Sequence, residues 1–147
     1  MNRLHSIIGG RDVFAINHNW TVLEAARYMA DKRVGAAAVL NGGRVVGVFS
    51  ERDLMTRVVV AGRSPANTLV AEVMTNDIVV GYPNDTEEEA MRKMQQAKCR
   101  HLPVIQDGVL LGFISMRDLF EVEIEERDQE IRLMNEYLHS TPTVVWQ

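Results

Sequence analysis

A short run of residues that could bind a polar ligand occurs twice in this chain. The first copy is Gly-Val-Phe-Ser-Glu-Arg-Asp-Leu at 47–54, and the second is Gly-Phe-Ile-Ser-Met-Arg-Asp-Leu at 112–119. In each copy a serine, and an aspartate three residues later, follow an apolar segment typical of a buried strand. One interpretation is structural: the serine caps a helix and the acid completes a capping box, although aspartate is shorter than the usual glutamate.

The other interpretation is a ligand site at the turn from strand to helix. A carboxylate there can accept two hydrogen bonds, which suits the adjacent hydroxyls of a ribose. Backbone N–H groups at the helix start and a nearby arginine suit a phosphate. The residues concerned are Ser50, Arg52 and Asp53 in the first copy and Ser115, Arg117 and Asp118 in the second. The two interpretations are compatible, because one aspartate can cap a helix and also bind a ligand.

The motif belongs to a longer internal duplication with an offset of 65 residues. Residues 12–54 align with 77–119 without a gap, and 14 of the 43 aligned pairs are identical. Ordinary composition would give about three identities by chance. Two copies of this length indicate two half-units that share one core, not an open array of repeats.

Hydrophobic periodicity and turn residues predict the order β-α-β-β-α for each copy. For the first copy we expect strands at 12–16, 35–40 and 45–49, a helix from Thr21 with Glu24 in a capping box, and a helix from Ser50 to about Ala61. A short helix capped by Thr68 and ending near Met74 should follow. For the second copy we expect strands at 78–80, 101–105 and 109–114, a helix at 86–97, and a last helix, interrupted or continuous, from Ser115 to about His139.

Composition excludes several classes of protein. The net charge of −4 does not favour a nucleic-acid backbone as partner. The single Cys99 rules out an internal disulfide. No apolar run reaches membrane-spanning length, and the N-terminus lacks a signal-peptide core, so a cytoplasmic protein is expected. The four histidines are scattered without ligand spacing, so we expect no metal site and no catalytic residues.

The duplicated motif in this order of elements resembles a pair of CBS domains, the tandem called a Bateman module. Arg100-His101-Leu102-Pro103-Val104 and Val73-Met74-Thr75 strengthen the resemblance, which covers about 8–125. It implies a mixed α/β (α+β) fold in which two repeats pack sheet to sheet about a pseudo-twofold axis. We place repeat 1 at 8–61, a linker with a short helix at 62–73, repeat 2 at 74–125, and a C-terminal helix and tail at 126–147.

The resemblance also implies two clefts, each taking an adenosine compound. AMP, ADP or ATP is the expected ligand, and NAD and S-adenosylmethionine present the same adenosine. One cleft would combine Ser115, Arg117, Asp118, Arg100, His101 and Phe113 with Val13, Phe14, Val34, Gly35 and Ala36. The other would combine Ser50, Arg52, Asp53 and Val48 with Ile78, Val79, Cys99, Arg100 and His101.

The two clefts are not expected to be equal. The second repeat offers Arg100 and His101 where the first has Gly35 and Ala36, so the Asp118 cleft has more positive charge for phosphates. His101 is equally well explained as a core histidine. We therefore predict tighter nucleotide binding at Asp118 than at Asp53.

These features predict a non-catalytic regulatory module that senses an adenosine compound and acts on a separate partner protein. A homodimer is also expected. An apolar stripe beyond the repeat, at Ile124, Ile131, Met134 and Leu138, offers a second surface for another subunit and lies between acidic residues. The alternative is an interaction protein, a homodimer with vestigial clefts, whose acidic C-terminal helix binds a partner.

Overall fold

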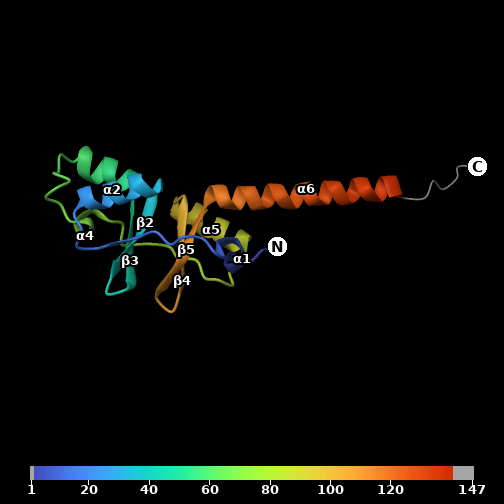
Figure 1. Ribbon diagram of the computed structural model, residues 1–147, viewed down its shortest axis with the longest axis horizontal. Coiled ribbons are helices and arrows are strands. Elements are labelled where there is room, and N and C mark those ends of the chain that lie inside the picture. The colour runs from blue at the N-terminus through green and yellow to red at the C-terminus, as the bar shows by residue number, and fades with distance from the viewer. Residues whose placement is uncertain (1, 141–147) are drawn as a thin grey trace, which may run out of the picture.

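The computed structural model describes residues 2–140 and shows two similar halves followed by one long helix (Figure 1). The elements are, in chain order, α1 (Leu4–Ile8), β1 (Ala15–Asn17), α2 (Val22–Lys32), β2 (Ala36–Asn41), β3 (Arg44–Ser50), α3 (Glu51–Asp53), the π-helix η1 (Leu54–Val59), α4 (Val70–Val73), α5 (Glu87–Ala97), β4 (His101–Gln106), β5 (Val109–Ser115) and α6 (Met116–Ser140). The mixed α+β fold with two repeats is confirmed. The predicted tail from residue 141 lies outside the described residues.

The duplication extends to how the helices begin and end. The predicted capping box of Thr21 and Glu24 is confirmed, and Thr86 with Glu89 repeats it at the start of α5. In both, the threonine hydroxyl accepts the N–H of the glutamate, at 3.2 and 3.1 Å. The residues that end α2 and α5 both have a left-handed backbone, and they too lie 65 positions apart, at 33 and 98.

The first half contains a three-stranded sheet in the order β1-β2-β3. β1 runs parallel to β2, and β2 and β3 form an antiparallel hairpin in which Ala36 pairs with Ser50. Gly42 and Gly43 close the hairpin at positive φ, which glycine adopts without steric cost. This register places the Ser50 motif beside the start of β2.

The second half has only the hairpin of β4 and β5, so the strand predicted at 78–80 was wrong. Gly81 alone bridges to β4: its N–H donates to the Pro103 carbonyl at 2.8 Å, and its carbonyl accepts the Ile105 N–H at 2.9 Å. In the first half the Ala38 N–H donates to the Phe14 carbonyl at 3.1 Å. The residue equivalent to Ala38 is Pro103, which has no N–H, so this ladder bond cannot form.

The two halves interlock through their short helices. Leu4 and Ile8 of α1 are buried in the core of the second half, and Val70 and Val73 of α4 are buried in the core of the first. Backbone hydrogen bonds also join each short helix to the half in which it is buried. The Leu4 N–H donates to the Asp85 carbonyl and the Val70 N–H donates to the Trp20 carbonyl, both at 2.9 Å. Each half therefore completes the other about a pseudo-twofold axis, and β3 contacts β5 where the sheets meet.

Two helices of the structure differ from their predictions. The helix expected from Ser50 to Ala61 is a short α3 followed by η1, in which the Val60 N–H reaches back five residues to the Met55 carbonyl. The run of β-branched valines at 58–60 disfavours a tight α-helix. Thr68 does not cap α4, because it is buried and its carbonyl accepts the Val22 N–H. Leu69 precedes the helix instead, and its N–H donates to the Glu72 carboxylate.

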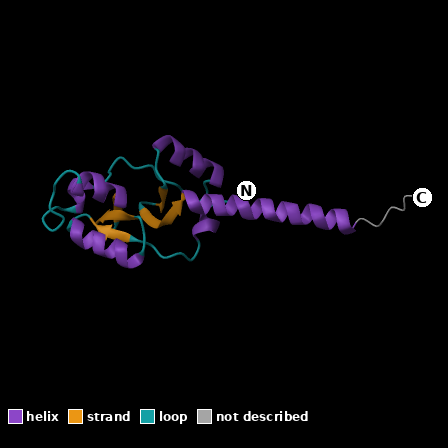
Figure 2. Ribbon diagram, turned by 90° about the horizontal axis from the view of Figure 1, so that it is seen from above, coloured by secondary structure: helices purple, strands orange, loops and turns teal. Residues whose placement is uncertain are grey.

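The last helix, α6, is continuous over 25 residues and extends away from the rest of the molecule (Figures 1 and 2). Its first turns pack against β5 and α5, and Leu119 is buried in the second core. Every residue from 127 to 139 is exposed. In the part of the chain that the structure describes, no helix combines the length and apolarity needed to cross a membrane.

Candidate ligand-binding site

Both Ser-x-x-Asp motifs form capping boxes at the turn from strand to helix. The Ser50 N–H donates to the Asp53 Oδ2 at 3.0 Å and the Asp53 N–H donates to the Ser50 Oγ at 3.1 Å. The corresponding distances between Ser115 and Asp118 are 2.8 and 3.1 Å. Aspartate is therefore long enough to close the box here, and the structural interpretation is confirmed for both copies.

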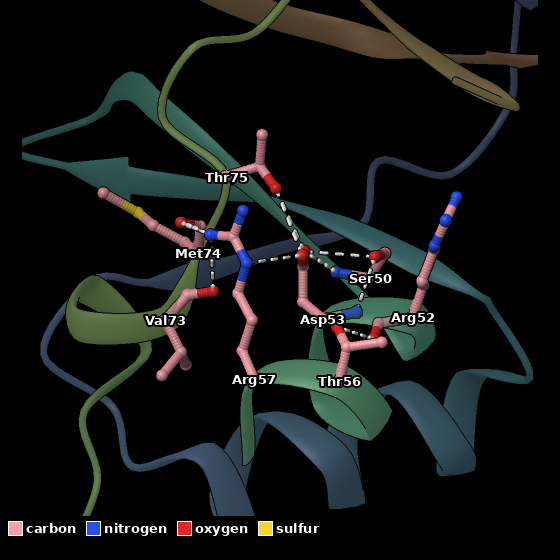
Figure 3. Close-up of polar contacts among 8 residues, drawn as sticks. All are labelled: Ser50, Arg52, Asp53, Thr56, Arg57, Val73, Met74 and Thr75. Carbon is pink, nitrogen blue, oxygen red and sulfur yellow. Dashed lines mark hydrogen bonds and ion pairs between the residues drawn. The ribbon is translucent and has the colours of Figure 1, made fainter. Parts of the chain in front are cut away.

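The Asp53 carboxylate is buried and has several partners within the chain (Figure 3). The Thr75 hydroxyl donates to Oδ1 at 3.1 Å, and the Arg57 Nε lies 3.6 Å from the same oxygen. The Ser50 hydroxyl donates to Oδ2 at 3.1 Å. Arg57 also donates to the Met74 carbonyl at 2.9 Å, so this cluster ties η1 to the segment that enters the second half.

The Asp118 carboxylate is more exposed than that of Asp53 and has fewer partners among the described residues. Its side chain is 19% exposed, against 10% for Asp53. The Arg11 Nη1 lies 2.8 Å from Oδ2, the oxygen that also accepts the Ser115 N–H. Burial opposes ionisation, but Arg11 and the Ser115 donors outweigh it, so the pKa of Asp118 lies below its ordinary value. Among residues 2–140, Oδ1 of Asp118 takes no hydrogen bond.

Arg11 is a residue that the sequence did not single out. It lies in the segment between α1 and β1, 107 positions before Asp118, and its side chain is 40% exposed. No local pattern marks it, and the equivalent residue in the second copy is Asn76. Its contact depends on the interlocking of the halves, which brings the start of the first repeat to the motif of the second.

His101 and Arg100 lie beside the Asp118 motif. His101 pairs with Ser115 across the β4–β5 hairpin, and the Arg100 carbonyl accepts the Met116 N–H at 2.9 Å. Burial lowers the pKa of His101 below its ordinary value, against the opposing effect of the carboxylates of Glu51 and Asp118. His101 is therefore mainly neutral at pH 7, and a carboxylate of each half is near enough to influence it.

The remaining residues predicted around Asp118 differ in how exposed they are. Phe14, Val34, Gly35 and Phe113 are partly buried, Ala36 is buried, and Val13 is 45% exposed two residues after Arg11. Glu51 lies next to Gly35: its N–H donates to the Gly35 carbonyl, and a Cβ on Gly35 would lie 3.1 Å from its carboxylate. Arg117 is held away from Asp118, because its side chain is 87% exposed and its Nε pairs with Glu121 at 3.2 Å.

The residues predicted around Asp53 are less clearly brought together. Val48 pairs with Thr75 through two backbone hydrogen bonds of 2.9 Å, which places it beside the Asp53 cluster. Val79 and Cys99 pack against the core of the second half, and burial raises the pKa of the Cys99 thiol. Ile78 is partly buried, whereas Arg52 is exposed.

A cavity of about 320 Å³ adjoins Asp118 and Arg11. It is lined by Asn2, Ser6, Ile7, Arg11, Asp118, Glu121, Val122 and Glu125. Three carboxylates face one guanidinium there, so this space suits hydroxyl or cationic groups better than phosphates. Within residues 2–140, no group of three or more His, Cys, Asp or Glu side chains is arranged to hold a metal ion.

The family model for the CBS domain matches the chain twice, at 8–60 and 70–125. The CBS domain-containing protein YhcV of Bacillus subtilis is 36% identical over 107 residues, which cover 73% of this chain and 76% of YhcV. The mitochondrial CBS domain-containing protein CBSX3 of Arabidopsis thaliana is 32% identical over 123 residues, or 80% of this chain. The chain spans 60% of the length of CBSX3 and smaller shares of several other Arabidopsis relatives.

Solved structures show the same fold. A putative signal-transduction protein with CBS domains from Burkholderia ambifaria has a TM-score of 0.79 and 33% identity, covering 84% of this chain and 95% of that protein. A hexameric CBS-CP12 protein from bloom-forming cyanobacteria has a TM-score of 0.74 and 26% identity, covering 97% of this chain and 87% of that protein. With both copies of the repeat matched and the fold shared over most of its length, this chain belongs to the CBS domain family.

Proposed function

We propose that this chain is a non-catalytic regulatory module that binds an adenosine nucleotide, AMP, ADP or ATP, and signals to a separate partner protein. Membership of the CBS domain family supports the ligand class and the regulatory role. NAD and S-adenosylmethionine carry the same adenosine and are the other candidates. The Asp118 cleft is the proposed main site, and the Asp53 cleft is the weaker one.

The difference between the two aspartates is the observation that carries this proposal. A ribose needs a carboxylate oxygen that can accept its hydroxyls. Both oxygens of Asp53 already accept hydroxyl or N–H donors from Ser50 and Thr75, and Arg57 lies close to Oδ1. At Asp118 the contacts converge on Oδ2, and the cation that holds it is partly exposed. A ribose at Asp118 therefore has fewer internal contacts to displace.

Arg11 offers a mechanism for the signal. In the free chain it neutralises Asp118, and a ribose would compete with it for the carboxylate. Because Arg11 lies on the segment that joins α1 to β1, the ligand would change how that segment is held between the halves. A ligand shifts such an equilibrium only by its difference in affinity for the two arrangements.

We also propose a homodimer formed through η1. Met55, Val59 and Val60 are at least 60% exposed there, which is unusual for three large apolar side chains on two adjacent turns. Burying this surface against a second copy would remove it from water.

The second candidate function is an interaction protein with vestigial clefts. Two observations favour it: the Asp53 carboxylate already accepts hydrogen bonds from within the chain, and the outer part of α6 is exposed. It requires that adenosine compounds have no effect on the protein at physiological concentrations.

The deciding experiment is a calorimetric titration of the purified chain with AMP, ADP, ATP, NAD, S-adenosylmethionine and GTP, after denaturation of one aliquot to detect copurified nucleotide. We expect binding of an adenosine compound but not of GTP. Asp118→Asn should weaken that binding about 10- to 100-fold, because it removes a charge-assisted hydrogen bond. Asp53→Asn is the matched control and should weaken it much less.

Equal losses in the two variants would contradict the assignment of Asp118 as the main site. No binding and no copurified nucleotide would favour the interaction protein. Because both aspartates close capping boxes, the titrations are made well below the thermal midpoint measured for each variant.

A further inference from the structure

We propose that the exposed apolar face of α6 is a docking surface for a helix of another protein, one with an apolar stripe flanked by lysine or arginine. We call this face the α6 stripe; it consists of Phe120, Ile124, Ile131, Met134 and Leu138. The inference does not depend on nucleotide binding, since it rests on a different part of the molecule.

The α6 stripe is uncovered by the described residues, and Arg127 interrupts it between Ile124 and Ile131. Its members follow at intervals of four, seven, three and four residues, which places them on one side of an α-helix. Each is between 50% and 67% exposed. Figures 1 and 2 show from two directions that α6 leaves the body of the protein, and no other element lies along its outer half.

A helix that projects in this way is expected to gain from a partner. Helices in water owe most of their stability to packing of an apolar face, and the outer part of α6 has no such packing within residues 2–140. A partner helix lying along the stripe would provide it. In heptad terms, Ile124, Ile131 and Leu138 occupy position a, whereas Phe120, Arg127 and Met134 occupy position d.

The charges beside the stripe select the kind of partner. The flanking e and g positions hold Glu121, Glu123, Asp128 and Glu130. The helix as a whole carries eight acidic residues and three arginines, a balance of −5, whereas the whole chain has −4. Glu121 and Glu123 each pair with an arginine of α6, but Asp128 and Glu130 have no ion pair within residues 2–140. Lysines or arginines on the partner would form ion pairs with these acidic residues.

The same charges disfavour a second copy of α6 as the occupant. In a parallel pair, Glu123 of one helix would face Asp128 of the other. In an antiparallel pair, Glu130 and Asp128 would each face their own counterparts. Like charges at these positions repel and determine partner choice in coiled coils. Arg127, at a position d, further favours a partner that presents an acidic residue opposite it.

The test uses the full chain and three labelled peptides of 21 residues. All three place leucine and isoleucine at positions a and d. The basic peptide has lysine at e and g and a glutamate opposite Arg127. The acidic peptide has glutamate at e and g, and the scrambled peptide has the basic composition without the stripe. Binding is measured by fluorescence anisotropy at two salt concentrations, with the chain and with a variant carrying Glu121→Lys, Glu123→Lys, Asp128→Lys and Glu130→Lys.

We expect the basic peptide to bind the chain at least about tenfold more tightly than the other two peptides, and more weakly at the higher salt concentration. The preference for basic over acidic peptide should reverse in the lysine variant, whose fold is checked by circular dichroism. Equal binding of the basic and scrambled peptides would overturn the proposal, because charge alone would then explain it. Failure of the basic peptide to bind would also overturn it, and a chain that loses self-association when residues 128–147 are removed would assign the stripe to a second copy.

Discussion

At the scale of single residues, the two copies of the motif have different surroundings. Asp53 and Asp118 occupy equivalent positions and make the same capping contacts, yet their outer partners differ. Thr75 and Arg57 saturate the first, whereas a single partly exposed arginine neutralises the second. The sequence predicted both capping boxes, which are confirmed, and the tighter nucleotide binding that it predicts at Asp118 stays a prediction. Its stated reason, the positive charge of Arg100 and His101, was incomplete, since His101 is mainly neutral and Arg11 is the cation in contact.

Glu87, in the first turn of α5, gives a residue-scale prediction about pH. Its Oε2 is buried without a hydrogen-bond partner among the described residues. Burial and the nearby Glu126 carboxylate raise the pKa of Glu87 above its ordinary value. A carboxyl whose pKa rises on folding destabilises the fold at pH values above the folded pKa, and this penalty disappears as the pH falls towards the unfolded value of about 4.3.

Glu87→Gln should therefore stabilise the chain at pH 7.5, by less than about 1 kcal/mol because the residue is partly exposed. At pH 4 the gain should vanish. Urea unfolding at the two pH values measures it. Glu88→Gln is the matched control, since Glu88 is exposed in the same turn and should give no gain. A stabilisation of Glu87→Gln that did not change with pH would show that its charge is not the cause.

At the scale of elements, predictions that rest on residues close in sequence were more reliable than predictions that need a contact with a distant segment. The capping boxes and both hairpins follow from residues close in sequence, whereas the sequence left open whether the last helix is interrupted. The strand predicted at 78–80 failed because a strand requires donors from its neighbour, and Pro103 supplies none at the necessary position. The form of η1 and the start of α4 were also predicted wrongly, although the contacts that define them are local.

The equivalent glycines Gly47 and Gly112 give an element-scale prediction. A Cβ on Gly47 would lie 2.7 Å from the Thr75 carbonyl oxygen and 2.8 Å from the Met74 sulfur, because the segment that follows α4 runs along β3. A Cβ on Gly112 would meet Ile8 at an ordinary 3.6 Å. Gly47→Ala should therefore cost about 1–3 kcal/mol in unfolding free energy, as overpacking does, whereas Gly112→Ala should be nearly neutral.

Chemical denaturation of the two variants makes the comparison, since each carries the same substitution at the same place in the repeat. Similar losses in both would mean that the Thr75 segment does not lie against β3 as described.

At the scale of the whole molecule, the exchange of short helices makes the two halves one folding unit. Leu4 and Ile8 complete the second core, and Val70 and Val73 complete the first. The exchange also brings Arg11 to Asp118 and Thr75 to Asp53. The segment that enters the opposite half therefore determines which residues contact each aspartate.

The proposed dimer through η1 is tested at this scale. The combined substitutions Met55→Glu and Val59→Glu should reduce the mass in solution from twice the chain mass to 16.6 kDa. Buried charges at a former apolar contact have no partner there, which explains the expected loss. Light scattering coupled to size exclusion measures the mass. Removal of residues 128–147 is the control and should leave the dimer intact; a monomer after that truncation would place the contact on α6.

By itself, the sequence determined the duplication, the β-α-β-β-α order of the first copy, the capping boxes and the two aspartates at equivalent turns, because each depends on residue types at short, fixed spacings. It also identified the CBS family through the repetition of these patterns. Only the tertiary structure decided which partners each aspartate has, where the second half lacks a strand, and how far α6 stands clear of the body. The contacts of Arg11 with Asp118, of Thr75 with Asp53 and of Gly81 with β4 join segments more than 20 residues apart, so packing and the available hydrogen-bond donors set them and no local spacing encodes them.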